Sequence, residues 1–347
     1  MNPVKFPFIS IVVIGFNEET NLNASMQSIL NSNYPRDKIE LIYVDSGSKD
    51  NSVVIAKKYT SNIFIEKHPF PTAARNRNRG LIESKYDIVH FIDSDIIINK
   101  DYLKFAVEKL LDGDVHGVFG RLEERNVNKI GKILLYVYGN FKPGYVDAPG
   151  AGGTFSKKVL IEVNGWDERI PRGEESELGE RLRKAGFKIW YLDKYMGSHD
   201  FGINNIFGFL KKQIGEGLSS GAISLINSDG AFFKNTKRII FSNFLQHLVL
   251  LIILLVAFQS SCWVIIILSI ILYNLLIFLK YYFIKRVRNI NSLRHFFLMN
   301  ITRSFVLYGN CKFYLKFLFV TKNNKSVFYN RISIKNLIVQ QQQNTVQ

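Results

Sequence analysis

Two long apolar runs in the last third of the chain constrain its fold more than any other feature. No Asp, Glu, Lys or Arg occurs in residues 239–258 or in residues 262–279. About 20 helical residues cross a hydrocarbon core of about 30 Å, so each run is long enough to span a bilayer. Because only three residues separate the runs, we expect an antiparallel membrane hairpin over residues 231–290, with helices at about 239–258 and 262–284. A buried helical hairpin in a soluble protein is the alternative.

Basic residues stand at both outer ends of the expected hairpin. They are Lys234, Lys237 and Arg238 before it and Lys280, Lys285, Arg286 and Arg288 after it. The positive-inside rule then places both ends, and the domain that precedes them, in the cytoplasm, with the hairpin integral to the cell (inner) membrane. The net charge of +16 also indicates an anionic partner. Acidic lipids fit this better than nucleic acid, because the basic residues crowd beside the apolar runs instead of forming an aromatic-interleaved face.

The chain after the hairpin is apolar and aromatic but interrupted by basic residues. Arg294, Arg303, Lys312 and Lys316 do not share one helical face, and Gly309-Asn310 is expected to break the stretch. We therefore expect residues 291–335 to form amphipathic pieces at the membrane surface, with a third membrane span as the alternative. Residues 336–347, with four consecutive glutamines, are expected to be a disordered tail. The two cysteines suggest neither a metal site nor a disulfide framework.

Residues 1–230 alternate between short apolar runs and helical periodicity, which is typical of an α/β domain. Strands are expected at 8–14, 39–44, 63–65 and 86–92, with helices near 22–30, 51–59 and 72–84. Nearly continuous apolar strands of this kind favour a mainly parallel sheet covered on both faces. Ligands bind such sheets at the carboxyl ends of the strands. The loops after Ile14, Val44 and Ile92 are therefore the places to look for a site.

Acidic side chains follow these strands. Asp45 opens a turn-rich segment, which in isolation is an ordinary turn. Asp93 and Asp95 stand two positions apart where an apolar strand ends, and such carboxylates suit a hard divalent ion such as Mg²⁺ or Mn²⁺. A third group begins with Glu174 and Glu175. It is either a helix N-terminus that favours acids or the source of a general base.

In their order and spacing, these segments resemble the family 2 glycosyltransferases, enzymes with the GT-A fold. The resemblance runs from about Ile9 to Gly217, with an Asn-Glu turn, a Val-Asp-Ser-Gly-Ser segment, a basic Ala-Arg-Asn helix, Asp-Ser-Asp and Glu-Glu. It departs from the family pattern at Ile14, where proline is usual, and at Ser46 and Glu175, where Asp is usual. The resemblance implies a GT-A, Rossmann-like catalytic domain in residues 1–230.

The resemblance also implies roles for single residues. The donor would contact Gly15, Phe16, Asn17, Glu18, Asp45, Arg75, Asp93, Gly152 and Gly153. Asp95, with Asp93 and His199, would hold a divalent metal, Mg²⁺ or Mn²⁺. Glu175 would be the catalytic base. Because its side chain is one methylene longer than the usual Asp, either the cleft is shifted or Glu174 shares the role. Arg77 and Arg79, on the same helix as Arg75, are expected to be exposed.

The activity implied is an inverting transfer of a sugar from a nucleoside-diphosphate donor. The membrane hairpin and basic surface suggest a lipid-linked or glycan acceptor, used in assembling a cell-surface polysaccharide or glycan. Two alternatives stay open: a polyprenyl-phosphate monosaccharide synthase, and a non-catalytic membrane-anchored protein that binds nucleotide-sugars or partners. A processive polymer synthase is less favoured, because one hairpin offers no obvious export channel.

Overall fold

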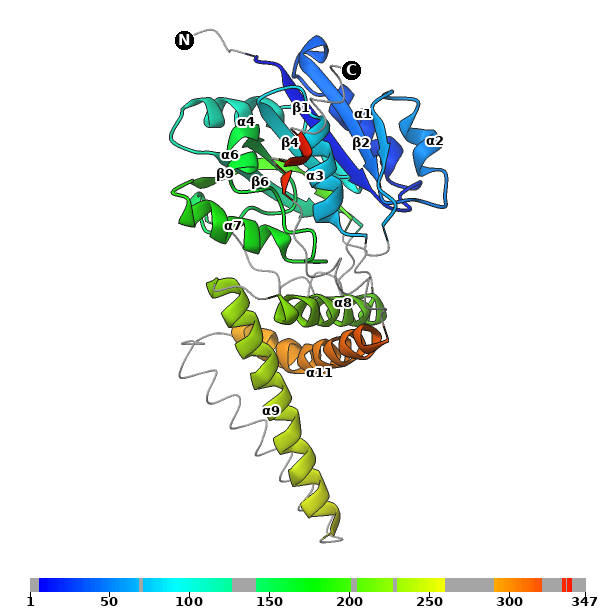
Figure 1. Cartoon of the computed structure of the whole chain (residues 1–347), viewed down its shortest axis with the longest axis vertical. Helices are drawn as coiled ribbons and strands as arrows, with labels where there is room; N and C mark the ends of the chain where they lie inside the picture. The colour runs from blue at the N-terminus through cyan, green and yellow to red at the C-terminus, as the bar shows by residue number, and fades with distance from the viewer. Residues whose placement is uncertain are drawn as a thin grey trace. The chain divides into compact units, whose positions relative to one another are not determined.

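The computed structural model describes residues 6–68, 71–126, 142–200, 205–226, 230–259, 290–319, 333–334 and 336–338. Their contacts divide them into two units. The α/β unit holds the described residues in 6–126, 142–200 and 333–338, and the helical unit holds those in 205–319. Figure 1 shows the sheet and helices of the first and the three long helices of the second.

The N-terminal half of the α/β unit is a parallel sheet with connecting helices, as the sequence predicts. Its elements are β1 (Ile9–Gly15), α1 (Leu22–Leu30), a 3-10 turn (Arg36–Lys38), β2 (Ile39–Asp45), α2 (Ser52–Ala56), β3 (Ile63–Ile65), α3 (Ala73–Glu83) and β4 (Ile88–Asp93). The strands lie in the order β3-β2-β1-β4, and each neighbouring pair is parallel. The predicted α/β fold of the GT-A type is confirmed.

The second half of this unit makes the sheet mixed. Its elements are β5 (Ile96–Ile98), α4 (Tyr102–Leu111), β6 (Gly117–Glu124), β7 (Gly144–Val146), β8 (Gly153–Ser156), α6 (Lys157–Glu162), α7 (Glu174–Lys184) and β9 (Ile189–His199). The order continues from β4 as β8-β6-β9-β5, with β7 on β9. Because β8 runs antiparallel to both β4 and β6, it separates two sets of parallel strands.

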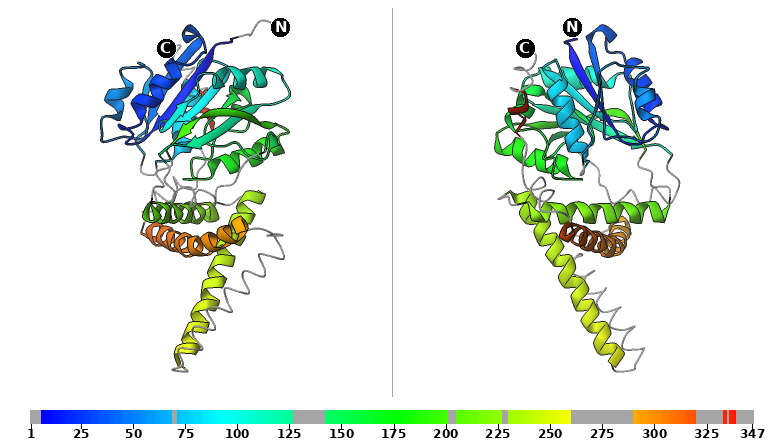
Figure 2. Two further views of the ribbon diagram at one scale, coloured as in Figure 1. Left: turned by 180° about the vertical axis from the view of Figure 1, so that it is seen from behind. Right: turned by 45° about the vertical axis from the view of Figure 1, so that its right-hand side comes forward.

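Helices cover both faces of the sheet, which explains why the side chains on both faces of β1 are buried (Figure 2). Ile9, Ile11 and Val13 of β1 belong to a core that also contains buried side chains of α1, α2 and α4. Val12 and Ile14 belong to the opposite core, with side chains of α3, α6 and α7. The alternation of β1 residues between the two cores is the period of two expected of a strand.

Residues 333–338 join the α/β unit from the far end of the sequence. Ile334 is fully buried in the core beside α3, α6 and α7. Its backbone N–H donates a 2.6 Å hydrogen bond to Asn164 Oδ1. Ile338 packs against the same core. Residues 336–338, which the sequence analysis assigned to a disordered tail, are helical here.

The helical unit consists of α8 (Ile206–Leu225), α9 (Ala231–Gln259) and α11 (Ile290–Leu318). In Figures 1 and 2, α8 and α11 lie side by side. Glycines let them approach closely, since a Cβ at Gly217 would overlap the backbone of Val306 and one at Gly309 that of Ile214. The break expected at Gly309-Asn310 does not occur, and α11 is continuous. Gly309 instead serves helix packing, and Asn310 Nδ2 donates to Val306 O at 3.1 Å.

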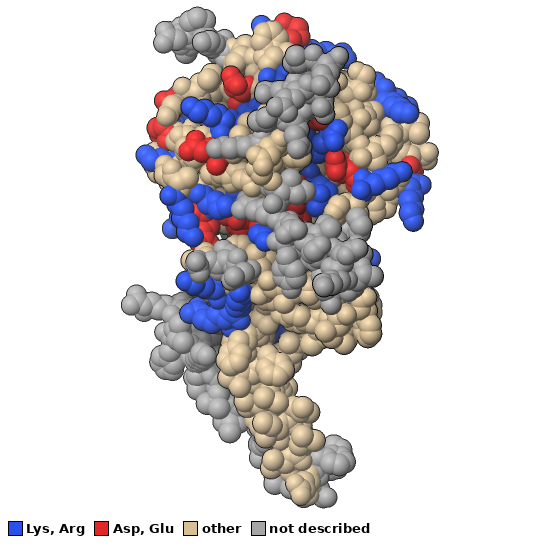
Figure 3. All heavy atoms as spheres, viewed as in Figure 1, with Lys and Arg blue, Asp and Glu red and all other residues tan. Residues whose placement is uncertain are grey.

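Among the described residues, one helix is long and apolar enough to cross a membrane, from Ala231 to Val256. This rests on length and composition alone. In Figure 3, the outer part of α9 shows no charged side chain on the face in view. The second predicted span, residues 262–284, lies outside the described residues.

Candidate functional site

The carboxyl ends of three parallel strands bring the first group of site residues together. The register of β1 and β2 pairs Gly15 with Asp45, and that of β1 and β4 pairs Ile14 with Asp93. Gly15 suits this crowded edge, since a Cβ there would lie 2.6 Å from the Tyr43 hydroxyl oxygen. The edge is the place where open α/β sheets bind ligands.

The turn after β1 is hydrogen-bonded to the segment after β2. The backbone N–H of Asn17 donates to Ser48 Oγ at 2.7 Å, and the N–H of Lys49 donates to Asn17 Oδ1 at 2.9 Å. Glu18 N–H donates to Ser52 Oγ at 2.8 Å. Asn17 has a φ of +55°, a conformation that asparagine tolerates better than most residues. Phe16 is thereby held on a rigid turn, with half of its surface exposed.

Asp45 organises its own turn. Its side chain is fully buried and accepts hydrogen bonds from the backbone N–H groups of Gly47 (2.8 Å) and Ser48 (2.5 Å). The hydroxyls of Tyr43 (2.8 Å) and Ser48 (2.7 Å) donate to its other oxygen. This geometry favours the structural role of an Asp turn over direct contact with a nucleotide.

Of the three arginines of α3, one has a different environment from the one expected. Arg75, expected near the donor, forms an ion pair with Glu168 at 2.8 Å. The expectation that Arg77 is exposed is wrong, because only 3% of its side chain is exposed. Since α3 packs its inner face on the sheet, residue 77 points inward along with Ala74 and Leu81. Arg79 is 39% exposed and pairs with Glu66 and Glu83.

Arg77 is the centre of the site. Its Nη2 lies 2.9 Å from Asp93 Oδ1, and its Nη1 lies 2.6 Å from Glu174 Oε1 and 3.5 Å from Glu175 Oε1. Burial alone would lower the pKa of Arg77, but the three carboxylates raise it. One buried guanidinium thus joins the end of β4 to the start of α7, so Asp93 and Glu175 share a single fixed partner.

Glu174 and Glu175 begin α7, directly after Gly173, whose φ is +81°. Acids in a first helical turn are favoured by the helix dipole. Glu174 is 5% exposed and tightly bound by Arg77, whereas the Glu175 side chain is 24% exposed. Burial and the charge of Glu174 raise the pKa of Glu175 to about 8, against the lowering effect of Arg77. Glu175 is therefore the more accessible of the two, and its raised pKa suits a proton acceptor.

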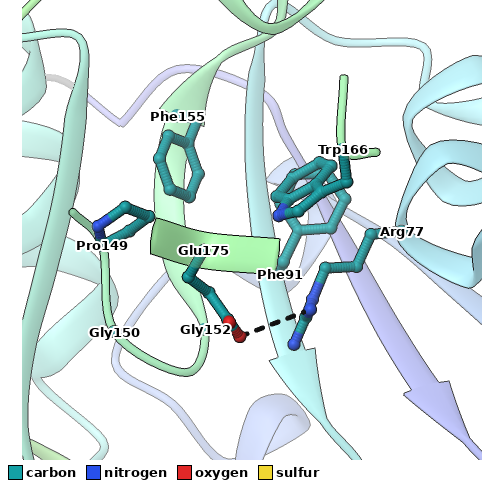
Figure 4. Close-up of a pocket in the computed structure, with 8 residues that line it drawn as sticks. All are labelled: Arg77, Phe91, Pro149, Gly150, Gly152, Phe155, Trp166 and Glu175. Atoms are coloured by element: carbon teal, nitrogen blue, oxygen red, sulfur yellow. Dashed lines mark ion pairs between the residues drawn. The ribbon is translucent and has the colours of Figure 1, made fainter. Parts of the chain in front are cut away.

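A small pocket lies beside Glu175. Its lining residues are Arg77, Phe91, Pro149, Gly150, Gly152, Phe155, Trp166 and Glu175. Figure 4 shows Glu175 and Arg77 directed toward each other, with Trp166 beside Arg77. The space open to a water-sized sphere is about 10 Å³, roughly the room that one water needs.

Gly152 and Gly153 form the wall of this region that faces β4. Their φ values are +79° and +151°, which favour glycine. A Cβ on Gly152 would lie 3.0 Å from Phe91 O. These glycines therefore bring the start of β8 against the end of β4, where Asp93 stands.

Asp95 and His199 form a second polar group near the same edge. His199 Nε2 lies 3.2 Å from Asp95 Oδ2, and Nδ1 lies 2.9 Å from Glu124 Oε1. Burial would lower the pKa of His199, but the bonds to Asp95 and Glu124 raise it to about 9. Sequence reasoning found His199 and Asp95 but not Glu124.

The residues present fit a divalent cation. Within the described part of the chain, Asp95 Oδ1 is buried and has no hydrogen-bond partner. The pKa of the nearby Glu18 is raised by burial and by the charges of Asp95 and Asp93, so negative charge gathers here. No cluster of three or more His, Cys, Asp and Glu side chains arranged for a metal is present among the described residues. Mg²⁺ commonly uses one or two carboxylates and takes its other ligands from phosphate and water.

Two functional residues escaped sequence reasoning. Arg77 was not found because three arginines alternate along α3, and only packing shows which one is buried. Glu124 ends β6 and pairs with His199 across the sheet, a register that no local pattern shows. Glu124 stands at the end of β6, whose second half, Arg121 to Glu124, is mainly charged and gives no sign of a site.

Comparison with known proteins finds similarity to glycosyltransferases. Residues 10–151 match the model of Glycosyl transferase family 2. Glycosyltransferase AglE of Haloferax volcanii is 29% identical over 206 residues, which cover 56% of this chain and 67% of AglE. The probable glycosyltransferase YdaM of Bacillus subtilis is 24% identical over 54% of this chain and 49% of its own length.

The name of one relative includes a dolichyl phosphate lipid. It is the dolichyl N-acetyl-alpha-D-glucosaminyl phosphate 3-beta-D-2,3-diacetamido-2,3-dideoxy-beta-D-glucuronosyltransferase of Methanococcus voltae, 22% identical over 62% of this chain and 73% of the relative. Among solved structures, mannosyltransferase PcManGT from Pyrobaculum calidifontis, in complex with GDP-Man and Mn²⁺, has a TM-score of 0.49 at 18% identity over 62% of each chain.

The segment from residue 10 to 151 contains β1 to β4 with Gly15, Asp93 and Asp95, and it reaches the loop before Gly152. The alignments with two of the relatives are longer, 206 residues for AglE and 235 for the Methanococcus voltae enzyme. Residues 10–151 of the chain thus match glycosyl transferase family 2, and the relatives that share this segment are glycosyltransferases.

Proposed function

We propose that the chain is an inverting glycosyltransferase that moves a sugar from a nucleoside-diphosphate donor to a hydroxyl of a lipid-linked glycan. The observation that carries this is the Arg77 cluster, in which one buried guanidinium holds Asp93 at the end of β4 and Glu175 at the pocket. A base beside a ligand-binding strand edge is what a one-step sugar transfer needs.

In this proposal Glu175 accepts the proton of the acceptor hydroxyl. The hydroxyl oxygen forms a bond to the anomeric carbon as the bond from that carbon to the diphosphate breaks, and the electron pair leaves with the diphosphate. Arg77 keeps the Glu175 carboxylate in place. Glu174 pairs with Arg77 and offsets the lowering effect of the guanidinium on the pKa of Glu175. The donor would lie along the turn of Gly15 to Glu18, with Gly152 and Gly153 opposite.

Asp95, His199 and Asp93 are the residues that would hold a divalent cation, Mg²⁺ or Mn²⁺. When bound, the cation neutralises charge on the diphosphate leaving group. Asp95 has the unpartnered oxygen for this role. Asp93, already bound to Arg77, is better placed to orient a ribose or phosphate.

A screen of UDP- and GDP-sugars with the purified chain tests the proposal. At least one donor should be hydrolysed or transferred in the presence of Mn²⁺, and Asp95→Asn should remove that activity without changing the melting temperature. Asp112→Asn, a change on an exposed residue after α4, is the matched control. If no donor in the screen is consumed, or if Asp95→Asn keeps full activity, the proposed function fails.

The pH dependence of transfer should follow the titration of Glu175. Its raised pKa of about 8 means that the free enzyme is mostly protonated at Glu175 below that pH and cannot take a further proton. We expect kcat/KM to fall about tenfold per pH unit below this pKa, which is raised first by burial and then by the charges of Glu174 and Asp93, against Arg77. A pH–rate profile of kcat/KM checks this, and a flat profile between pH 5 and pH 8 would contradict it.

Three features of the helical unit support a lipid-linked acceptor. Its described residues include nine Lys and Arg but a single acid, Glu216. The apolar part of α9 directly follows Lys237 and Arg238. An apolar groove of about 520 Å³ runs between the three helices, and its lining includes Phe241, Phe244, Leu307 and Lys237. A basic rim beside an apolar groove suits an anionic lipid.

Filling the groove should weaken the lipid acceptor selectively. Leu307→Trp places a large side chain in the groove and should raise KM for a lipid-linked acceptor about tenfold, which corresponds to about 1.4 kcal/mol. Donor hydrolysis should not change. Leu315→Trp, on an exposed position of the same helix, is the control. Equal KM values for both variants would contradict the lipid assignment, and transfer to polyprenyl phosphate itself would indicate a monosaccharide synthase.

A further inference from the structure

His199 lies between two carboxylates that come from two different strands. In the sheet, β9 pairs with β6 in parallel and with β5 in antiparallel orientation. The first register pairs His199 with Glu124, and the second pairs it with Ile96, the residue after Asp95. The topology thus fixes Glu124, His199 and Asp95 in a row at one edge of the sheet.

The two ring nitrogens of His199 have separate partners. Nδ1 lies 2.9 Å from Glu124 Oε1, and Nε2 lies 3.2 Å from Asp95 Oδ2. The histidine side chain is 9% exposed and that of Glu124 is 17% exposed. An ionised carboxylate can only accept a hydrogen bond, so both ring nitrogens donate here, Nδ1 to Glu124 and Nε2 to Asp95. A cation bound at Asp95 would displace the hydrogen of Nε2 to solvent, while Glu124 keeps the hydrogen on Nδ1. The carboxylate therefore determines which nitrogen is turned toward the cation site.

The backbone around this row is also fixed. Arg125 N–H donates to His199 O at 2.9 Å, and its guanidinium donates to Ser198 O at 2.9 Å. The same guanidinium donates to Asn21 Oδ1 at 3.0 Å, just before α1. Arg125 and the pairing of β6 with β9 therefore hold the backbone of neighbouring Glu124, as a group that orients another side chain needs.

We propose that Glu124 is the positioning residue of His199: it holds Nδ1 and keeps Nε2 beside Asp95 as a ligand for the divalent cation. This rests on the proposed function in that the cation site belongs to it. Partners of this kind, bound to the far nitrogen of a ligating histidine, typically contribute 10- to 100-fold to metal affinity. Glu124 touches neither donor nor acceptor in this scheme and acts through His199 alone.

Mn²⁺ binding to the full chain tests this without any sugar transfer. The electron paramagnetic resonance signal of free Mn²⁺ gives Kd in the presence of UDP, and of GDP in a parallel series. Glu124→Ala should raise Kd about 10- to 100-fold. Glu123→Ala is the matched control, since Glu123 is adjacent, 56% exposed and paired only at 3.5 Å with Arg121. It should leave Kd unchanged.

A double-mutant cycle separates positioning from a general electrostatic effect. If Glu124 acts through His199, the double variant Glu124→Ala/His199→Ala should bind Mn²⁺ no more weakly than His199→Ala alone. Additive losses, or an unchanged Kd in Glu124→Ala, would overturn the inference. Should Glu124→Ala melt early in circular dichroism, Glu124→Gln keeps the size and an acceptor oxygen, and it should lie between Glu124→Ala and the wild type. Absence of any nucleotide-sugar turnover alongside the expected Kd values would refute only the proposed function.

Discussion

Replacing Glu175 by glutamine is expected to lower kcat for sugar transfer by about 100- to 10,000-fold, the usual contribution of a general base. The amide keeps the size of the side chain but cannot accept the acceptor's proton. Donor binding should be nearly unchanged, because Glu175 touches the acceptor side of the reaction in this mechanism. Steady-state kinetics with the donor identified by screening give kcat and KM separately.

Two controls make the Glu175 result interpretable. Glu162→Gln, at an exposed position at the end of α6, should be fully active. Glu174→Gln should affect the structure of the site more than the chemistry, since Glu174 is buried against Arg77. A Glu174→Gln variant as inactive as Glu175→Gln, with an intact fold and donor affinity, would move the base to Glu174.

The replacement of Arg77 by methionine should have the largest effect on stability. Methionine matches the length of the arginine stem but leaves Asp93, Glu174 and Glu175 without their cation. Removing one partner of a buried ion pair usually costs about 3–5 kcal/mol, because the remaining charge stays buried and uncompensated. Denaturation in urea measures the loss in the free energy of unfolding.

The neighbouring arginine provides the comparison. Arg79→Met removes pairs with Glu66 and Glu83 from a side chain that is 39% exposed, and exposed pairs contribute about 0–1 kcal/mol. Lowering the pH should partly restore Arg77→Met, since protonation removes the unpaired charges. A loss below about 1 kcal/mol in Arg77→Met would show that the cluster does not organise the site.

The sequence was sufficient for the parallel half of the fold because its signals there are local. Each of β1, β2 and β4 is a short, continuous apolar run followed by turn residues. Their boundaries differ from the expected ones by one or two residues. The antiparallel entry of β8 between β4 and β6 depends on contacts between distant segments, which no local pattern records.

The site residues also divide into those that local sequence predicts and those that depend on distant contacts. Asp93 ends β4 and Asp95 lies two residues further on, so the apolar run before them was enough to predict their place at the sheet edge. The burial of Arg77 depends on which side of α3 faces the sheet, and the pairing of Glu124 with His199 depends on the register of β6 and β9. Asp45 is the converse case. Its motif can be recognised in the sequence, but in the structure its carboxylate accepts hydrogen bonds from the backbone of its own turn.

The return of residues 333–338 to the α/β unit bears on how the protein is made. Ribosomal synthesis proceeds from the N-terminus, at about 5–20 residues per second. The residues that contact Ile334, including Asn164 and Gly165, are synthesised long before Ile334 itself leaves the ribosome. The helical unit is synthesised in between, over an interval on the order of ten seconds. During that time the core beside α3, α6 and α7 lacks the Ile334 side chain. The core around Asn164 and Gly165 in the nascent α/β unit therefore stays open to water until residues 333–338 are synthesised.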